Sequence, residues 1–147
     1  MTIASLCGPT CGSQFFVHVF GALALFGGAL TVVIVSLAAL RIPAHALLLR
    51  RIAFWTTLVL MVPAWILMYF GGYWLLSHEG LDESTLGWAE AGIHLAEVAA
   101  ALTIILLTLS WLARRRPRLG PWLAGVATLY ALALAVAWFF MSAKPSI

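Results

Sequence analysis

The sequence predicts an all-α membrane protein, a transmembrane antiparallel four-helix bundle. Hydrophobic residues make up 64% of the 147 residues and charged residues only 9%, whereas soluble domains carry about 25% charged residues. The apolar residues fall into four runs, each long enough to cross a bilayer. The connections between the runs are short, which favours neighbouring helices that alternate in direction. A chain of this length is expected to form one domain within the lipid bilayer.

The four predicted spans cover residues 14–40, 52–76, 86–113 and 122–141. Seven of the eight basic residues lie in the first and third connections, and three of the five acidic residues lie in the second. The positive-inside rule therefore places the first and third connections in the cytoplasm and both termini outside. Basic residues that are confined to short connections indicate membrane orientation, so we do not expect a nucleic-acid partner.

The tail before the first span contains the two cysteines, Cys7 and Cys11. In the predicted orientation they lie outside the cytoplasm, where a disulfide can form. Two free thiols or half of a zinc or copper site are the alternatives, since two sulfurs do not complete a metal site. The first apolar run has no basic region before it and is too long for a signal peptide, so we expect it to remain as a span.

The first two spans carry a histidine, glycines and aromatic residues. His18 lies about one turn into the first span, and Gly27-Gly28 follows it. Glycines in membrane helices allow close approach of another backbone, so this pair predicts helix packing. In the second span Pro63 is expected to bend the helix. Trp65 and Tyr69 are four residues apart in its outer half and are expected to pack, with a cofactor pocket as the alternative.

The third span contains three ionisable residues, Glu90, His94 and Glu97. Because they are spaced by four and three residues, they lie along one face of a helix. Ionisable groups at membrane depth are costly and usually face a protein interior or a water-filled cavity. These residues are therefore the main functional candidates. The fourth span has no ionisable residue and is expected to form a wall of the bundle, with Tyr130 and Trp138 as its polar groups.

The first and third spans both begin on the outer side, so His18 and His94 are predicted at similar depth. Two histidines on facing helices are suited to ligate haem b, because a four-helix bundle can hold the flat ring between its helices. The first hypothesis is therefore a membrane-embedded b-type haem protein that works in electron transfer or quinol chemistry. Its partners would be a quinone or a redox protein.

Other uses of the same residues remain open. His18, His94, Glu90 and Glu97 together offer ligands for a non-haem copper, zinc or iron ion. Glu90 and Glu97 are also suited to a proton relay or to contacts behind the ligands. Such sites occur in transporters, accessory subunits and assembly factors. The same residues would be hydrogen-bonding links between helices if their role were structural. A homodimer would double the number of histidines and glutamates.

Two segments carry a family resemblance. Phe16-Val-His18-Val-Phe-Gly21 with Gly27-Gly28 is similar to the first helix of bacterial membrane proteins of the copper-resistance D type and of a related uncharacterised set. Pro63-Ala64-Trp65, Gly71-Gly72-Tyr-Trp74-Leu, Gly80 and Trp88 resemble that uncharacterised set. The resemblance covers residues 16–116 and implies a four-helix bundle in the bacterial inner membrane. By analogy with cytochrome b-type domains it also implies haem or copper handling. Of the candidate ligands, His18 is the one that falls on a position of the family pattern.

Overall fold

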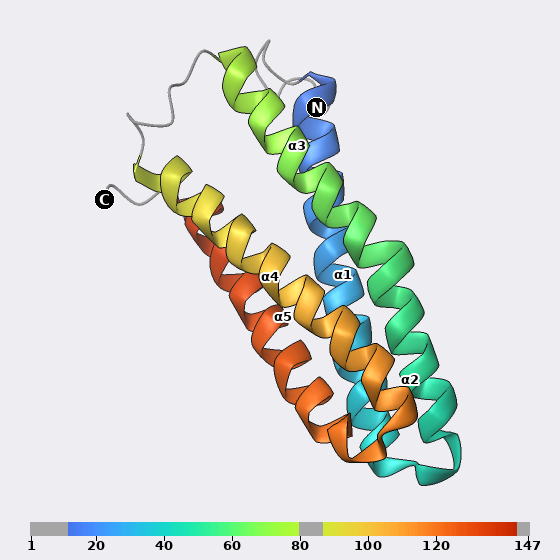
Figure 1. The fold of residues 1–147 in the computed structure, drawn as a ribbon. Coiled ribbons are helices and arrows are strands. Elements are labelled where there is room, and N and C mark those ends of the chain that lie inside the picture. Colours follow the sequence, from blue (N-terminus) through green and yellow to red (C-terminus); the bar gives the residue numbers. More distant parts are fainter. Residues whose placement is uncertain (1–11, 80–86, 144–147) are drawn as a thin grey trace, which may run out of the picture.

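The structure, a computed structural model, describes residues 12–79 and 87–143, with side chains described for residues 12–77 and 92–139. These ranges contain helices and no strand, and four helical stretches are long and apolar enough to cross a membrane. The prediction of an all-helical protein with four helices long enough to cross a membrane is confirmed for these ranges. The elements are α1 (Ser13–Arg41), η2 (Pro43–His45), α2 (Ala46–Trp55), η3 (Thr56–Met61), α3 (Val62–Glu79), α4 (Gly87–Arg115), η5 (Pro117–Leu119) and α5 (Gly120–Ala143), as Figure 1 shows.

The second helical stretch begins at Pro43 rather than at residue 52, where the sequence analysis began it. Proline is well suited to a first helical turn because its φ is fixed and its missing N–H would have no partner there. Ala46 and the leucines after it are good helix formers and continue the helix. Arg50 and Arg51 therefore lie on α2, and the connection between α1 and the second stretch is shorter than predicted.

The two turns that follow α1 and α4 have the same local design. Ile42 (φ −122°, ψ 79°) and Arg116 (φ −125°, ψ 91°) each precede a proline that opens a 3₁₀ turn. The proline ring disfavours the helical region for the residue before it. At Ile42 and Arg116 the chain leaves one helix and begins the next at once. Both turns lie at the same end of the molecule, at the bottom of Figure 1.

We name this end the basic end and the opposite end, where α1 and α4 begin, the histidine end (Figure 1). Seven of the eight basic residues belong to the basic end, and all are arginines: Arg41, Arg50, Arg51, Arg114, Arg115, Arg116 and Arg118.

The helix around Pro63 is widened. Residues Thr56–Met61 form a π-helical segment, in which the N–H of Val62 bonds to the carbonyl of Thr57. A proline ring clashes with the carbonyl four residues before it, and a wider turn is one way to relieve that clash. The sequence predicted a bend at Pro63, and the structure has a π-helical segment on the N-terminal side of this proline.

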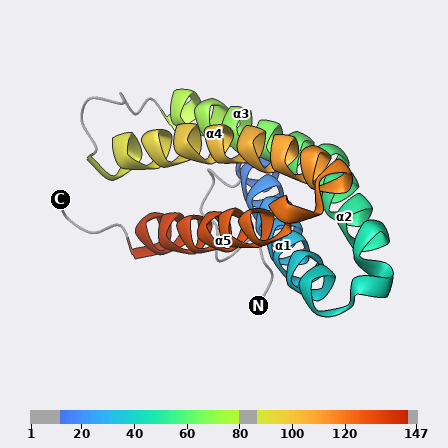
Figure 2. The ribbon, with the colours of Figure 1, turned by 60° about the horizontal axis from the view of Figure 1, so that its bottom comes forward.

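The helices pack around α1. This helix contacts α3 and α5, while α4 contacts α5 and α2, and Figures 1 and 2 show α1 beside both of its main neighbours. Small residues are frequent in the contacts, which is typical of helices that associate within lipid. Gly28 faces Met61, whereas Gly27 faces open space. Fully buried members of the core include Leu25, Ala29, Val32, Ala53, Met61, Leu106, Ala127 and Tyr130.

The outer surface is rich in large apolar side chains. Phe16, Ile34, Ile104, Trp122 and Phe139 are each at least 65% exposed. A water-soluble protein does not expose so much apolar surface. The surface therefore suggests a lipid bilayer as the surroundings of these helices.

Candidate functional site

His18 lies in the contact between α1 and α3. Its Nδ1 is 2.7 Å from the carbonyl oxygen of Met68. Because a carbonyl oxygen only accepts hydrogen bonds, Nδ1 carries a proton and donates it. In the neutral ring Nε2 then holds the lone pair, which is the arrangement that a backbone carbonyl gives to metal-binding histidines. The donor chemistry of His18 therefore fits an iron or metal ligand.

Glycines make this contact close enough for the hydrogen bond. A Cβ added to Gly71 would lie 2.8 Å from the backbone nitrogen of His18, and one added to Gly72 would lie 3.1 Å from its Nδ1. On α1, a Cβ added to Gly21 would lie 2.9 Å from the carbonyl oxygen of Ala64. A side chain at Gly21 or Gly71 would meet backbone and push the helices apart, and one at Gly72 would displace the imidazole. The glycines therefore hold the ring against the backbone of α3.

His94 and Glu97 form a pair on α4. The Nδ1 of His94 is 3.3 Å from Oε2 of Glu97, and their side chains are 69% and 57% exposed. They lie near the start of the apolar stretch Gly92–Arg115, so the pair belongs to the histidine end. A carboxylate beside Nδ1 orients an imidazole. Glu90 lies on the same helix, but its side chain is outside the described residues.

The two histidines have partners on different helices. His18 bonds to α3, while His94 pairs within α4. Where side chains are described, no group of three or more His, Cys, Asp or Glu lies together in a way that could hold a metal ion. The predicted four-residue metal set includes Glu90, whose side chain lies outside that part of the chain. Cys7 and Cys11, the predicted disulfide, lie outside it as well. These site assignments and the joint ligation of haem by His18 and His94 stay predictions.

Aromatic residues of α3 stack on one another, and one of them bonds to α4. Trp65 stacks on Tyr69 with ring centroids 5.0 Å apart, and Tyr69 meets Tyr73 edge-on at the same distance. The indole Nε1 of Trp65 donates to the carbonyl oxygen of Ala96 at 2.9 Å. This bond joins α3 to α4 beside Glu97. Trp65 and Tyr69 therefore serve in packing, as the sequence analysis expected.

Arg50 has a structural role that its sequence pattern did not predict. Arg50 is only 8% exposed, and its Nη1 donates to the carbonyl of Ala113 at 3.4 Å. Ala113 is in the last turns of α4, where the helix dipole favours a positive charge. Gly120 leaves the space, since a Cβ there would be 3.1 Å from Nη2. Adjacent helical residues point about 100° apart, so the doublet Arg50-Arg51 was a usable signal that one arginine faces inward.

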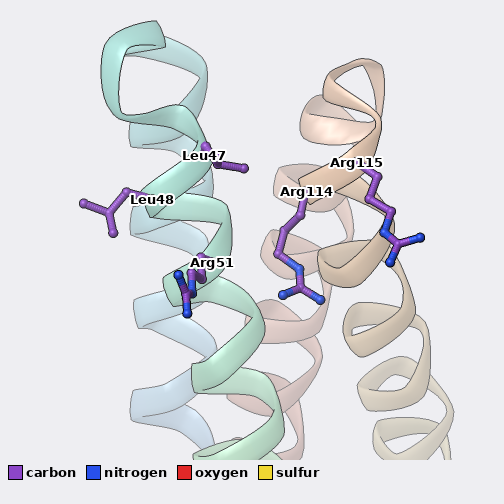
Figure 3. A pocket seen from close by; sticks show the side chains of 5 residues that line it. All are labelled: Leu47, Leu48, Arg51, Arg114 and Arg115. Carbon is purple, nitrogen blue, oxygen red and sulfur yellow. The ribbon is translucent and has the colours of Figure 1, made fainter.

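The sequence analysis also did not identify a pocket at the basic end. An open pocket of about 470 Å³ is lined by Leu47, Leu48 and Arg51 of α2 and by Arg114 and Arg115 of α4. Figure 3 shows Arg114 extending into the space between the two helices, with Leu47 pointing toward it from α2. The sequence analysis used these arginines only for membrane orientation, because which helices lie side by side is not encoded in their spacing.

Comparisons of the chain with protein-family models, curated proteins and solved structures found no match. The resemblance to the copper-resistance D type therefore stays a prediction, and function has to be argued from the residues themselves.

Proposed function

We propose that this protein is a membrane-embedded b-type haem protein of the bacterial inner membrane, working in electron transfer or quinol chemistry. Its four spans form an antiparallel bundle with the basic end in the cytoplasm and the histidine end and both termini outside. The positive-inside rule supports this orientation, because seven of the eight basic residues belong to one end.

The observation that carries the haem proposal is the hydrogen bond from His18 to the carbonyl of Met68. This bond fixes the ring tautomer and orientation before any ligand binds, so His18 needs no rearrangement to present Nε2. Haem, when bound, supplies one-electron transfer. The tight contact at Gly71 and Gly72 holds the imidazole of His18 against α3.

We assign His94 as the second axial ligand. Glu97 is placed to orient its ring through Nδ1, which is 3.3 Å from the carboxylate. In a homodimer each copy would bring one His18 and one His94. The axial ligands of a haem would be His18 and His94 whether both come from one copy or one comes from each copy. Redox partners consistent with this end of the bundle are a quinone in the bilayer or a redox protein outside.

The test is the absorption spectrum of the detergent-purified protein after reconstitution with haemin, recorded oxidised and dithionite-reduced. A Soret band with sharp reduced α and β bands is expected. His18→Ala and His94→Ala should each abolish the six-coordinate spectrum. His45→Ala is the matched control, because His45 is exposed at the basic end, and it should leave the spectrum unchanged. A protein that stays colourless after reconstitution contradicts the proposal.

A second candidate function rests on the exposed pair His94 and Glu97. A carboxylate beside an imidazole near the membrane surface is suited to bind a transition metal ion or to pass protons, as in a transporter, accessory subunit or assembly factor. This candidate predicts bound copper, zinc or iron by elemental analysis, lost in His94→Ala and Glu97→Gln and retained in His45→Ala. Haem spectra with no other metal would favour the first proposal.

A further inference from the structure

Within residues 12–77 and 92–139, where side chains are described, the arginines at the basic end form no ion pair with an acidic residue. All five acidic residues lie between positions 79 and 97 of the sequence. The ion pair present in the described part of the chain joins His94 and Glu97. The pocket between α2 and α4 is therefore lined by three guanidinium groups, Arg51, Arg114 and Arg115, with no carboxylate to neutralise them. Such a pocket attracts an anion.

Aromatic rings hold two of these guanidinium groups in place. The guanidinium carbon of Arg114 is 3.9 Å from the ring centroid of Phe54, and that of Arg115 is 4.8 Å from that of Trp111. A guanidinium that rests on a ring keeps its N–H edge available, and that edge matches two oxygens of a phosphate group. The arrangement thus favours a phosphate oxyanion as the ligand.

Two buried nitrogens strengthen this inference. The Nε atoms of Arg114 and Arg50 are buried and have no hydrogen-bond partner among the described residues. A buried, charged donor without a partner is costly, and Arg114 also lines the pocket, so its charge there is not offset by its protein surroundings. Arg50 lies against the end of α4, bonded to Ala113, and adds a further positive charge at this end of the bundle.

The surroundings of the pocket indicate a membrane lipid as the source of the phosphate. The pocket lies where the apolar stretches Pro43–Ser77 and Gly92–Arg115 reach the basic end, which is headgroup level for a chain that spans the bilayer. Leu47 and Leu48 beside it are 65% and 57% exposed, and Trp111 is 41% exposed on α4. Acyl chains would cover these side chains. Basic pockets between membrane helices bind anionic headgroups in this way.

We propose that the pocket between α2 and α4 binds the phosphate group of an anionic phospholipid, with Arg51, Arg114 and Arg115 as its ligands and Leu47 and Leu48 against the acyl chains. This site is independent of the proposed haem site, because it lies at the other end of the bundle.

The experiment is a titration of the detergent-purified protein with phosphatidylglycerol or phosphatidylcholine, followed by native mass spectrometry. The wild type should bind phosphatidylglycerol about tenfold more tightly than phosphatidylcholine. Both lipids offer phosphate oxygens, but the trimethylammonium of choline cancels the phosphate charge and is repelled by the guanidinium groups. The double variant Arg51→Gln/Arg114→Gln should lose that preference. Arg41→Gln/Arg118→Gln is the matched control. It removes the same charge from exposed arginines at the basic end, and it should retain the preference within about threefold.

Equal losses in the two double variants would overturn the proposal, because they would show diffuse attraction by surface charge. No preference in the wild type would also overturn it.

Inorganic phosphate is the second probe. If it binds the lipid-free protein as tightly as phosphatidylglycerol does, the ligand is free phosphate and the lipid assignment is wrong. If Arg51→Gln/Arg114→Gln does not fold, Leu47→Glu replaces it. This variant leaves every arginine in place and puts a carboxylate at an exposed pocket position, and it too should abolish the preference.

Discussion

In the contact between α1 and α3 backbone meets backbone, whereas in the contact between α4 and α5 two hydroxyl groups meet within a layer of side chains. Gly21 of α1 and Gly71 of α3 place no side chain of their own between α1 and α3. In the second contact the hydroxyl oxygens of Thr103 and Tyr130 are 2.9 Å apart, and both residues are buried. Helices in lipid lack the hydrophobic drive that water provides, so they associate through close packing or through polar links. This bundle uses one solution in each contact.

The difference explains where a ligand-bearing histidine can be held. The carbonyl of Met68 is already part of α3, and the ring of His18 reaches it only because glycines let the two backbones come close. A contact filled by large side chains would keep an imidazole away from the backbone of the neighbouring helix. The α1–α3 contact therefore combines packing with orientation of His18, while the α4–α5 contact holds two helices together and carries no candidate ligand.

The largest expected effect comes from adding one carbon to the glycine contact. In Gly21→Ala the new Cβ would overlap the backbone nitrogen of Met68 and lie 2.9 Å from its Cα. Backbone atoms cannot move aside as a flexible side chain can, so the helices must separate. We expect the free energy of unfolding to fall by about 3 kcal/mol, measured by denaturation in mixed detergent and dodecyl sulfate micelles.

Gly27→Ala is the matched control, since it makes the same change on the same helix where a Cβ meets nothing within 4 Å. Its effect on the free energy of unfolding should stay within about 0.5 kcal/mol. Similar losses in the two variants would mean that alanine acts through the helix itself, and the account of a backbone contact would be wrong.

The next effect comes from the hydroxyl pair, and it depends on which partner is removed. The Oγ1 of Thr103 lies 2.7 Å from the carbonyl oxygen of Ala99. That carbonyl can only accept, so the single hydroxyl proton of Thr103 goes to it, and Tyr130 must donate to Thr103. Thr103→Val leaves a buried phenol without a partner, whereas Tyr130→Phe leaves Thr103 still bonded to Ala99.

Thr103→Val should therefore lower the free energy of unfolding by about 2 kcal/mol, and Tyr130→Phe by about 1 kcal/mol. Adding Tyr130→Phe to Thr103→Val should recover part of the loss, because the buried hydroxyl is then gone. The same micelle denaturation, applied to the two single variants and the double variant, measures this cycle. Additive losses would show that the two hydroxyl groups are not coupled.

Hydropathy predicted the helical spans because apolar length alone decides whether a helix can cross a bilayer. Helical periodicity likewise indicated that His94 and Glu97 share a face. The partner of His18 could not be predicted in the same way. It is the backbone carbonyl of Met68. Every residue has a backbone carbonyl, whatever its side chain, so no sequence pattern marks this one.

The neighbours of each helix were also beyond the sequence. Short connections imply that successive helices are adjacent, yet α1 contacts α5 as well as α3. The buried position of Arg50 likewise follows from which helices are neighbours. Its guanidinium donates to the end of α4 and occupies the space that Gly120 leaves at the start of α5. A charge count by loops assigns every arginine to the membrane surface, whereas the packing places one of them inside.

The smallest expected effect concerns α3 and α4, which contact each other much less than the two pairs compared above. Trp65 donates its indole N–H to the carbonyl of Ala96 at 2.9 Å. Trp65→Phe removes that donor but keeps an aromatic ring against Tyr69. Because Ala96 retains its bond within α4, no buried group loses its only partner. The free energy of unfolding should fall by about 0.6 kcal/mol.

Trp74→Phe makes the same exchange on α3, at a residue that is 50% exposed, and serves as the control in the same denaturation experiment. Hydrogen exchange of the α4 amides around Ala96 adds a local readout, and it should become faster in Trp65→Phe alone. If Trp65→Phe instead costs as much as Thr103→Val, the indole bond is a main link of the bundle. The bundle would then have a third kind of contact, a side chain bonded to the backbone of the neighbouring helix. This contact joins α4 to α3, the helix whose Met68 carbonyl binds His18.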